Sequence, residues 1–167
     1  ITGVGFQPDM TWIKERSQLR SPVLFDVIRG ATVQFNPNDT AIDATVAESL
    51  KSFDADGFTV GTETSVNQSG ETYVAWCWKE TADAGFDIVS YTGNGTDDTD
   101  ISHNLSAVPK MIIVKNRDAT DDWQIYHAGN TSAPETDYMV LNESDATADN
   151  ADRWSDEAPT SSVFTLG

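Results

Sequence analysis

The stretch Pro8-Asp-Met-Thr-Trp-Ile-Lys-Glu-Arg16 is followed about a hundred residues later by Pro109-Lys-Met-Ile-Ile-Val-Lys-Asn-Arg117. The two stretches align without a gap and share proline, methionine, lysine and arginine at the same four places. At the same spacing, Leu24-Phe25 falls on Ile125-Tyr126. Matches that recur in one order at a fixed period are the signature of a duplicated supersecondary unit.

A further match places Phe58-Thr-Val-Gly61 on Phe164-Thr-Leu-Gly167 after a small change in length. We therefore expect residues 1–80 to form a first β repeat and residues 81–167 a second, related one. The two repeats are out of phase with the ends of the chain, because the apolar stretch Tyr73–Trp78 follows the first copy and has no counterpart after the second.

The second repeat is accordingly predicted to lack its last strand. An unpaired strand edge and an uncovered apolar face both favour association. We expect a strand from a neighbouring chain, or later residues of a longer parent protein, to fill this place. The alternative is that Tyr73–Trp78 serves both repeats in a single sandwich.

The repeated segments have the composition of β-strands. Met10 to Glu15 and Met111 to Lys115 are short and rich in β-branched or apolar residues. Tyr73 to Trp78 is apolar on both faces, which predicts a central strand covered on each side. Asp54 to Gly57 predicts a tight hairpin turn. The other predicted strands are Phe86–Tyr91, Tyr138–Leu141 and Ser162–Leu166.

Many short strands joined by Gly- and Asp-rich turns predict an all-β fold, specifically a β-sandwich of the jelly-roll or lectin-like kind. The one helical candidate is Asp39 to Lys51, where Ile42, Val46 and Leu50 recur at four-residue spacing. The alternative for this segment is a long loop.

Composition limits the partners. The chain has 167 residues, a net charge of −17 and 38% hydrophobic residues, so it can form a globular core. Nucleic acid and anionic membrane surfaces would repel it, and no apolar run has the length of a membrane span. Cys77 stands alone within an apolar strand, which predicts a buried thiol and not a nucleophile.

No pattern of residues predicts catalysis. The chain has no Gly-x-Ser-x-Gly elbow and no phosphate-binding loop. His103 and His127 have no metal-ligand spacing, and the Asp54/Asp56 pair and the acidic run at residues 97–100 do not fit a calcium loop. We therefore predict no enzyme activity, no cofactor and no metal site, and we assign the aspartates to turns.

Two kinds of residue are candidates for contact with sugars. Trp123 and Trp154 lie in polar stretches and are the predicted candidates for glycan contact, whereas Trp76 and Trp78 are expected to be buried. Six asparagines begin an Asn-x-Ser/Thr sequon, where composition alone would give roughly two. The excess fits either N-glycosylation or the crowding of Asn and Thr into β-turns, at Asn38, Asn67, Asn94, Asn104, Asn130 and Asn142.

A series of motifs in this order resembles a known group of proteins. It comprises Gly5-Phe-Gln-Pro8, Leu24-Phe-Asp-Val-Ile-Arg-Gly-Ala31, Ser52-Phe-Asp-Ala-Asp-Gly-Phe-Thr59, Gly70-Glu-Thr-Tyr-Val-Ala-Trp76 and Ser90-Tyr-Thr-Gly-Asn-Gly-Thr96. The series resembles repeat modules of tailed-bacteriophage structural proteins, especially those of marine phages, found in tail fibres and other virion appendages. The resemblance implies a lectin-like β-sandwich on the virion surface and brings no catalytic residues.

These observations predict a non-catalytic structural and adhesive module located on a virion surface or otherwise outside the cell. Its expected partners are copies of itself, other virion proteins and host-surface glycans, with no nucleic acid and no membrane insertion. The second hypothesis is a subunit of a glycosylated extracellular filament or surface layer. A polysaccharide depolymerase is the third, and it would need a cleft with paired carboxylates.

Overall fold

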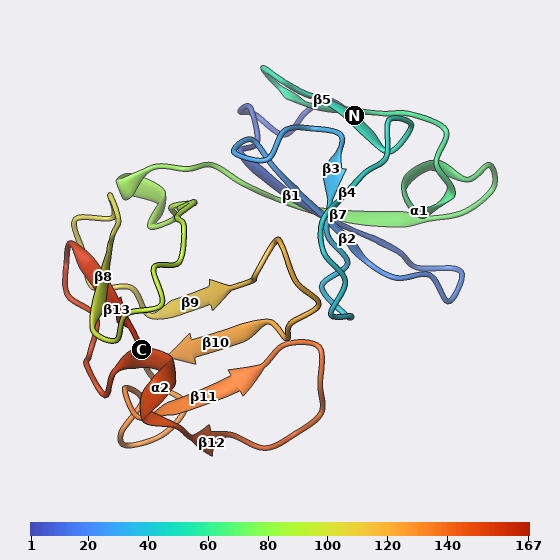
Figure 1. Cartoon of the computed structure of the whole chain (residues 1–167). Helices are drawn as coiled ribbons and strands as arrows, with labels where there is room; N and C mark the ends of the chain where they lie inside the picture. The colour runs from blue at the N-terminus through green and yellow to red at the C-terminus, as the bar shows by residue number, and fades with distance from the viewer. The chain divides into compact units, whose positions relative to one another are not determined.

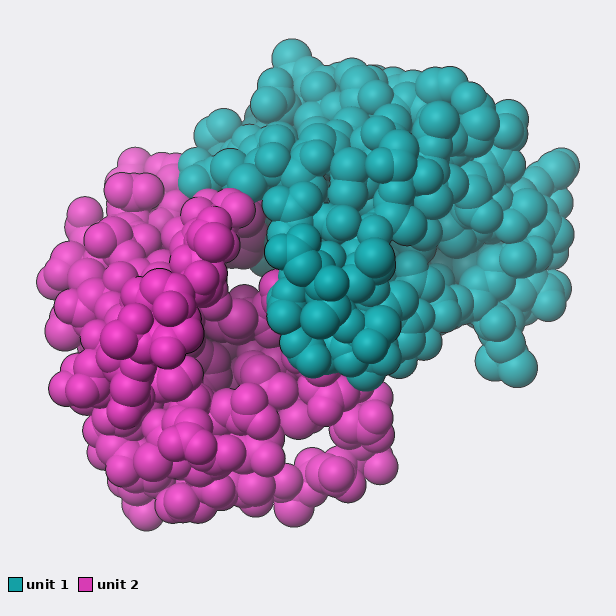
Figure 2. All heavy atoms as spheres, in the orientation of Figure 1, with its two compact units in different colours: residues 1–80, 116–121 teal, residues 81–115, 122–167 magenta.

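The computed structural model describes residues 1–167, and strands account for nearly all of its regular structure (Figure 1). The predicted all-β class is therefore confirmed. The chain divides into two compact units, shown in different colours in Figure 2. Unit 1 contains residues 1–80 and 116–121, and unit 2 contains residues 81–115 and 122–167.

Unit 1 has one three-stranded antiparallel sheet and two short hairpins. The sheet has the order β2-β1-β7, and the hairpins are β3-β4 and β5-β6. The elements are β1 (Met10–Glu15), β2 (Val23–Asp26), β3 (Val33–Gln34), β4 (Ala44–Thr45), β5 (Leu50–Asp54), β6 (Gly57–Val60), α1 (Thr64–Asn67) and β7 (Tyr73–Trp78).

The core of unit 1 follows from alternation along β1. Side chains of successive strand residues point to opposite faces, and Thr11, Ile13 and Glu15 are buried while the residues between them are half-buried. Ile13 packs in a cluster with five other buried apolar residues, Val23, Phe25, Leu50, Phe58 and Val66. The repeated sequence therefore supplies the centre of the core.

Unit 2 has a four-stranded antiparallel sheet of order β12-β11-β10-β9 and a separate pair, β13-β8. Its elements are η1 (Ala82–Ala84), β8 (Thr99–Ser102), β9 (Met111–Val114), β10 (Gln124–His127), β11 (Asp137–Val140), β12 (Ala148–Asp149), α2 (Ala151–Trp154) and β13 (Val163–Leu166). Its buried apolar residues are Ile101, Trp123, Ile125, Tyr126, Trp154 and Phe164. The packing of sheets into a sandwich stays a prediction.

The central strand pair has the same register in both units. In unit 1, β1 pairs β2 with Met10 opposite Asp26. In unit 2, β9 pairs β10 with Met111 opposite His127, so both partners are shifted by 101 positions. The flanking backbone bond repeats as well, from Val27 N–H to Asp9 O and from Ala128 N–H to Lys110 O, each at 2.9 Å. The sequence repeat therefore corresponds to one repeated strand pairing.

The next two strands also recur, with a shift of 104 positions. In unit 1, β3 and β4 pair Val33 with Thr45, and in unit 2, β11 and β12 pair Asp137 with Asp149. The constant shift within each pairing shows that the added residues lie in the connection before β11. After these strands the secondary structure of the two units differs, because β5 follows β4 in unit 1 and α2 follows β12 in unit 2.

The same physical reason explains why each Phe-Thr-x-Gly motif ends in a glycine. A Cβ atom on Gly61 would lie 2.4 Å from the backbone oxygen of Glu48, and one on Gly167 would lie 3.0 Å from the backbone of Asp152. Glu48 and Asp152 are themselves related by the shift of 104. At Gly61 the neighbouring backbone lies too close for a side chain, and at Gly167 it lies so close that a side chain would need the neighbouring backbone to shift slightly.

Three sequence predictions about secondary structure are wrong. Asp39 to Lys51 is not a helix: the Asp39 side chain accepts the Ala41 N–H in a turn, and Ala44 and Thr45 pair with β3 as strand β4. Phe86 to Tyr91 is not a strand, since Phe86 forms one isolated bridge with Thr81 and the rest of the segment has no strand partner.

The third correction concerns β7. The strand forms as predicted, but it is the edge of its sheet and not a covered central strand. Trp76 was expected to be buried and is 49% exposed. The apolar residues on its outer face pack along the sheet surface, where Trp76 meets Trp12.

Burial raises the pKa of the Cys77 thiol, although the residue is only half-buried.

Candidate functional site

The outer edge of β9 is an unpaired strand edge, because the sheet of unit 2 ends there (Figure 1). The bond from Ala128 N–H to Lys110 O fixes the alternation of hydrogen bonds along β9 and β10. In an antiparallel ladder, pairs that exchange hydrogen bonds alternate with pairs that do not. Ile112 bonds β10, and the N–H and C=O groups of Met111 and Ile113 point away from it.

In unit 1 the same edge is occupied. β7 pairs with β1 along its whole length, with Trp78 opposite Met10 and Trp76 opposite Trp12. The aromatic rings of Trp12 and Trp76 meet edge to face with centroids 6.5 Å apart. β7 belongs to the sheet of unit 1 alone, so it does not pair with β9.

The absence of a third strand leaves β9 more exposed than β1. Met111 is 50% exposed and Ile113 is 41% exposed, whereas their counterparts Met10 and Trp12 are half-buried. The inward-facing residues of β9 follow the same trend, since they are half-buried where those of β1 are buried. The outer edge of β9 therefore offers both free backbone groups and apolar side chains.

Such an edge can bind an extended peptide. Main-chain hydrogen bonds supply affinity and the alternating side chains supply specificity in this mode of recognition. Lys110 is exposed immediately before β9, and lysines at strand edges hinder uncontrolled pairing between sheets. The site is thus suited to a specific strand more than to aggregation.

The two tryptophans predicted to contact glycans lie in the interior. Trp123 is 4% exposed and Trp154 is 2% exposed. The Trp154 ring packs edge to face on Tyr126 at 6.0 Å between centroids. Both are core residues of unit 2 and cannot act as stacking platforms on its surface. The polar sequence around them, which suggested exposure, is the polar sequence of the turns that flank them.

An open cleft of about 380 Å³ lies elsewhere in unit 2, along the loop at residues 93–97. Tyr91 lines it and is 40% exposed, and its pKa is raised by burial. Asn94 and Asp97 border the same cleft, but their side-chain oxygens already accept hydrogen bonds. Asn94 Oδ1 accepts from Thr96 N–H, and Asp97 Oδ1 accepts from Asp98 N–H and Ser155 Oγ. Sequence reasoning did not single out Tyr91.

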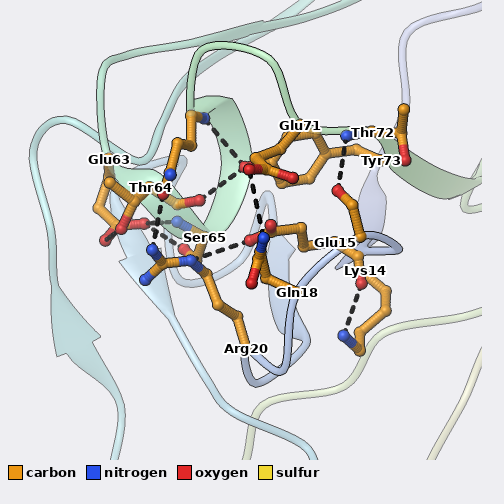
Figure 3. Close-up of polar contacts among 12 residues, drawn as sticks. Lys14, Glu15, Gln18, Arg20, Glu63, Thr64, Ser65, Glu71, Thr72 and Tyr73 are labelled. Carbon is orange, nitrogen blue, oxygen red and sulfur yellow. Dashed lines mark hydrogen bonds and ion pairs between the residues drawn. The ribbon is translucent and has the colours of Figure 1, made fainter.

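A partly buried polar cluster joins β1 to the segment around α1 in unit 1 (Figure 3). The Glu15 side chain is fully buried, and its Oε2 lies 2.9 Å from Arg20 Nε in an ion pair with poor hydrogen-bond direction. Arg20 Nη2 donates to Gln68 Oε1 at 2.6 Å. Tyr73 OH donates to Thr64 O at 2.7 Å and accepts from Gln68 N–H. These contacts connect three segments of the unit and have a structural role.

The carboxylates in the predicted acidic turn already accept hydrogen bonds from other groups of the same chain. Asp54 accepts from Thr59 Oγ1 and Ser52 Oγ, each at 2.7 Å, and Asp56 accepts the N–H groups of Gly5 and Gly3. These hydrogen bonds hold the pKa of both carboxyls below the usual range. No three His, Cys, Asp or Glu side chains converge as metal ligands would.

Removing divalent cations should leave the protein's melting temperature almost unchanged. The reason is that the aspartate oxygens already accept hydrogen bonds from neighbouring backbone and hydroxyl groups, and a ligand stabilises only the native state to which it binds. Calorimetry with and without a chelator, at constant ionic strength, measures this. A fall of many degrees with the chelator would show that calcium or a similar ion is bound.

The histidines lie apart. His103 is buried, with Nε2 lying 3.3 Å from Thr160 O, and His127 is exposed at the end of β10.

Five of the sequon asparagines are exposed, namely Asn38, Asn67, Asn94, Asn104 and Asn130. Asn142 differs, because it is half-buried and its amide bonds Trp123 N–H and Asp122 Oδ1. Glycosylation at the exposed five stays a prediction.

No helix of the structure has the length and apolar character required to cross a bilayer.

Residues 1–167 match the family described as "Domain of unknown function (DUF7483)", and the chain belongs to this family. Neither a curated protein nor a solved structure matches the chain.

Proposed function

We propose that this member of the DUF7483 family is a non-catalytic structural and adhesive module of a virus particle, placed in a tail fibre, an appendage or the capsid surface. The observation that carries the proposal is the duplicated strand pairing of units 1 and 2, which ends in an open apolar edge at β9. Repeated β-units with an open edge suit a protein that assembles with others through sheet contacts.

Two further observations support the proposal. The ordered motifs of the sequence resemble repeat modules of bacteriophage structural proteins. The net charge of −17 disfavours the interior of a particle, where a protein meets nucleic acid, and suits a solvated outer surface. The expected partners are other virion proteins or further copies of this chain.

Contact with a host glycan belongs to the adhesive part of the proposal. Because Trp123 and Trp154 are buried, another aromatic side chain must supply the stacking surface. Tyr91 is the exposed aromatic beside a cleft, and an aromatic ring next to polar groups is a common sugar-binding arrangement.

Electron microscopy of native virus particles with an antibody against this chain tests the proposal. We expect label on the outer surface of intact particles, and the chain among the proteins of purified particles. Purified particles that contain no trace of the chain would overturn the proposal.

A subunit of a glycosylated extracellular filament is the second candidate, favoured by the five exposed sequon asparagines. Mass spectrometry of the native protein distinguishes the two candidates. Sugar mass on these asparagines, together with filaments that form without any capsid, would favour the filament. Bare asparagines on a particle-bound chain would favour the virion module.

A further inference from the structure

We propose that the outer edge of β9 binds one extended strand donated by another protein chain, and that this strand is apolar on both faces, as β7 is. The inference rests on the proposed assembly role only for the identity of the donor. The binding itself follows from the comparison of the two units.

The register of the donated strand follows from unit 1. There, Trp78, Trp76 and Val74 lie opposite Met10, Trp12 and Lys14. The bond from Arg16 N–H to Thr72 O at 2.8 Å shows that these pairs exchange hydrogen bonds. Because β9 repeats β1 with a constant shift, the positions of a donated strand that correspond to Trp78 and Trp76 would bond Met111 and Ile113.

The side chains of the donated strand follow from the same comparison. On the inner face of β7, Tyr73 and Cys77 pack against the core of unit 1. On the outer face, Trp76 contacts Trp12. A strand on β9 would bring one apolar set onto the inner face of the sheet and place a large side chain over Ile113, which is 41% exposed. The occupant is therefore a strand with apolar residues on both faces.

The donor is a segment other than β7 itself. In this chain β7 is held by β1 along its whole length, and in any further copy of the chain it would be held in the same way. Moving it to β9 would uncover β1 and yield no net pairing. Charge limits which strands could be donors. Lys110 stands where unit 1 has Asp9, so the donated strand should carry an acidic residue at the end that lies beside Lys110.

Two peptides with the sequence of residues 71–80 test the proposal, each with Cys77→Ser to prevent oxidation. One carries an N-methyl group on Trp76, whose N–H bonds the neighbouring strand in unit 1. The other carries it on Ala75, whose N–H points to the opposite edge. The two peptides have the same composition and differ only in which edge is blocked.

Fluorescence anisotropy of labelled peptides with the full chain measures binding. We expect saturable binding of the Ala75-methylated peptide, and binding at least about tenfold weaker for the Trp76-methylated one. The chain variant Ile113→Pro should lose binding of both peptides. Proline there removes an N–H that β10 does not use, and prolines are tolerated on strand edges.

Equal binding of both peptides, binding of neither, or binding unaffected by Ile113→Pro would overturn the proposal. If Ile113→Pro fails to fold, the two peptides on the unmodified chain still decide the question. The result is independent of where the protein resides, because a chain absent from virus particles could still bind the strand. Conversely, a particle protein that binds neither peptide would retain the proposed function and exclude this mode of assembly.

Discussion

Replacing Phe25 with alanine is expected to lower the free energy of unfolding by about 3–5 kcal/mol. Phe25 is 0% exposed, lies on β2 opposite Thr11 and packs in the six-residue core of unit 1. The substitution removes a whole aromatic ring from a close-packed interior, and the surrounding strands can relax only in part. Urea denaturation followed by tryptophan fluorescence measures the loss.

Leu19→Ala is the matched control for this experiment. The Leu19 side chain is fully exposed, so its removal should change stability by less than about 0.5 kcal/mol. A loss below about 1 kcal/mol for Phe25→Ala, or equal losses for both variants, would contradict the position of Phe25 at the centre of the core.

Arg20→Ala is expected to destabilise the protein by about 3 kcal/mol, near the lower end of the range for breaking buried ion pairs. The Glu15 carboxylate is fully buried, and Arg20 Nε at 2.9 Å is its ionic partner. Without the guanidinium, the carboxylate stays in the interior with no compensating charge. Because Arg20 is 39% exposed in its side chain, solvent screening keeps the loss from reaching the top of the range.

The double variant Arg20→Ala/Glu15→Gln separates charge from packing. Glutamine has nearly the shape of glutamate without its charge, so the double variant should recover part of the stability lost by Arg20→Ala. Denaturation of the two single variants and the double variant completes the cycle. A double variant whose loss equals the sum of the single losses would show that Glu15 and Arg20 do not interact energetically.

The repeat was the strongest signal in the sequence because each shared residue has a structural reason. The first motif becomes β1 and β9, with Ile13 buried and its counterpart Val114 half-buried, and the shared glycines lie where backbone meets backbone. The tight hairpin turn at Asp54 to Gly57 was predicted from Asp and Gly, and Phe53 and Phe58 on either side of it pair directly. Local chemistry of this kind can be read without knowing distant partners.

The errors arose where distant partners decide the outcome. β7 is apolar on both faces, yet it is an edge because no further strand pairs with it. Trp154 lies in a polar stretch, but the shift of 104 that relates the later strands aligns it with Leu50, which is fully buried. Carrying the repeat through that connection would have placed Trp154 in the core. The Glu15–Arg20 pair left no signal, since an acidic residue at a strand end is usually solvated.

Amide hydrogen exchange at Trp12 and Ile113 tests most directly whether unit 2 repeats the strand pairing of unit 1 without its third strand. The Trp12 N–H bonds β7, and the Ile113 N–H faces the open edge. In the protein alone we predict strong protection at Trp12, exchange near the intrinsic rate at Ile113, and protection of both Thr11 and Ile112, whose N–H groups bond the neighbouring strands β2 and β10. Equal protection of Trp12 and Ile113 would contradict the claim that β9 lacks the third strand that β7 provides to β1.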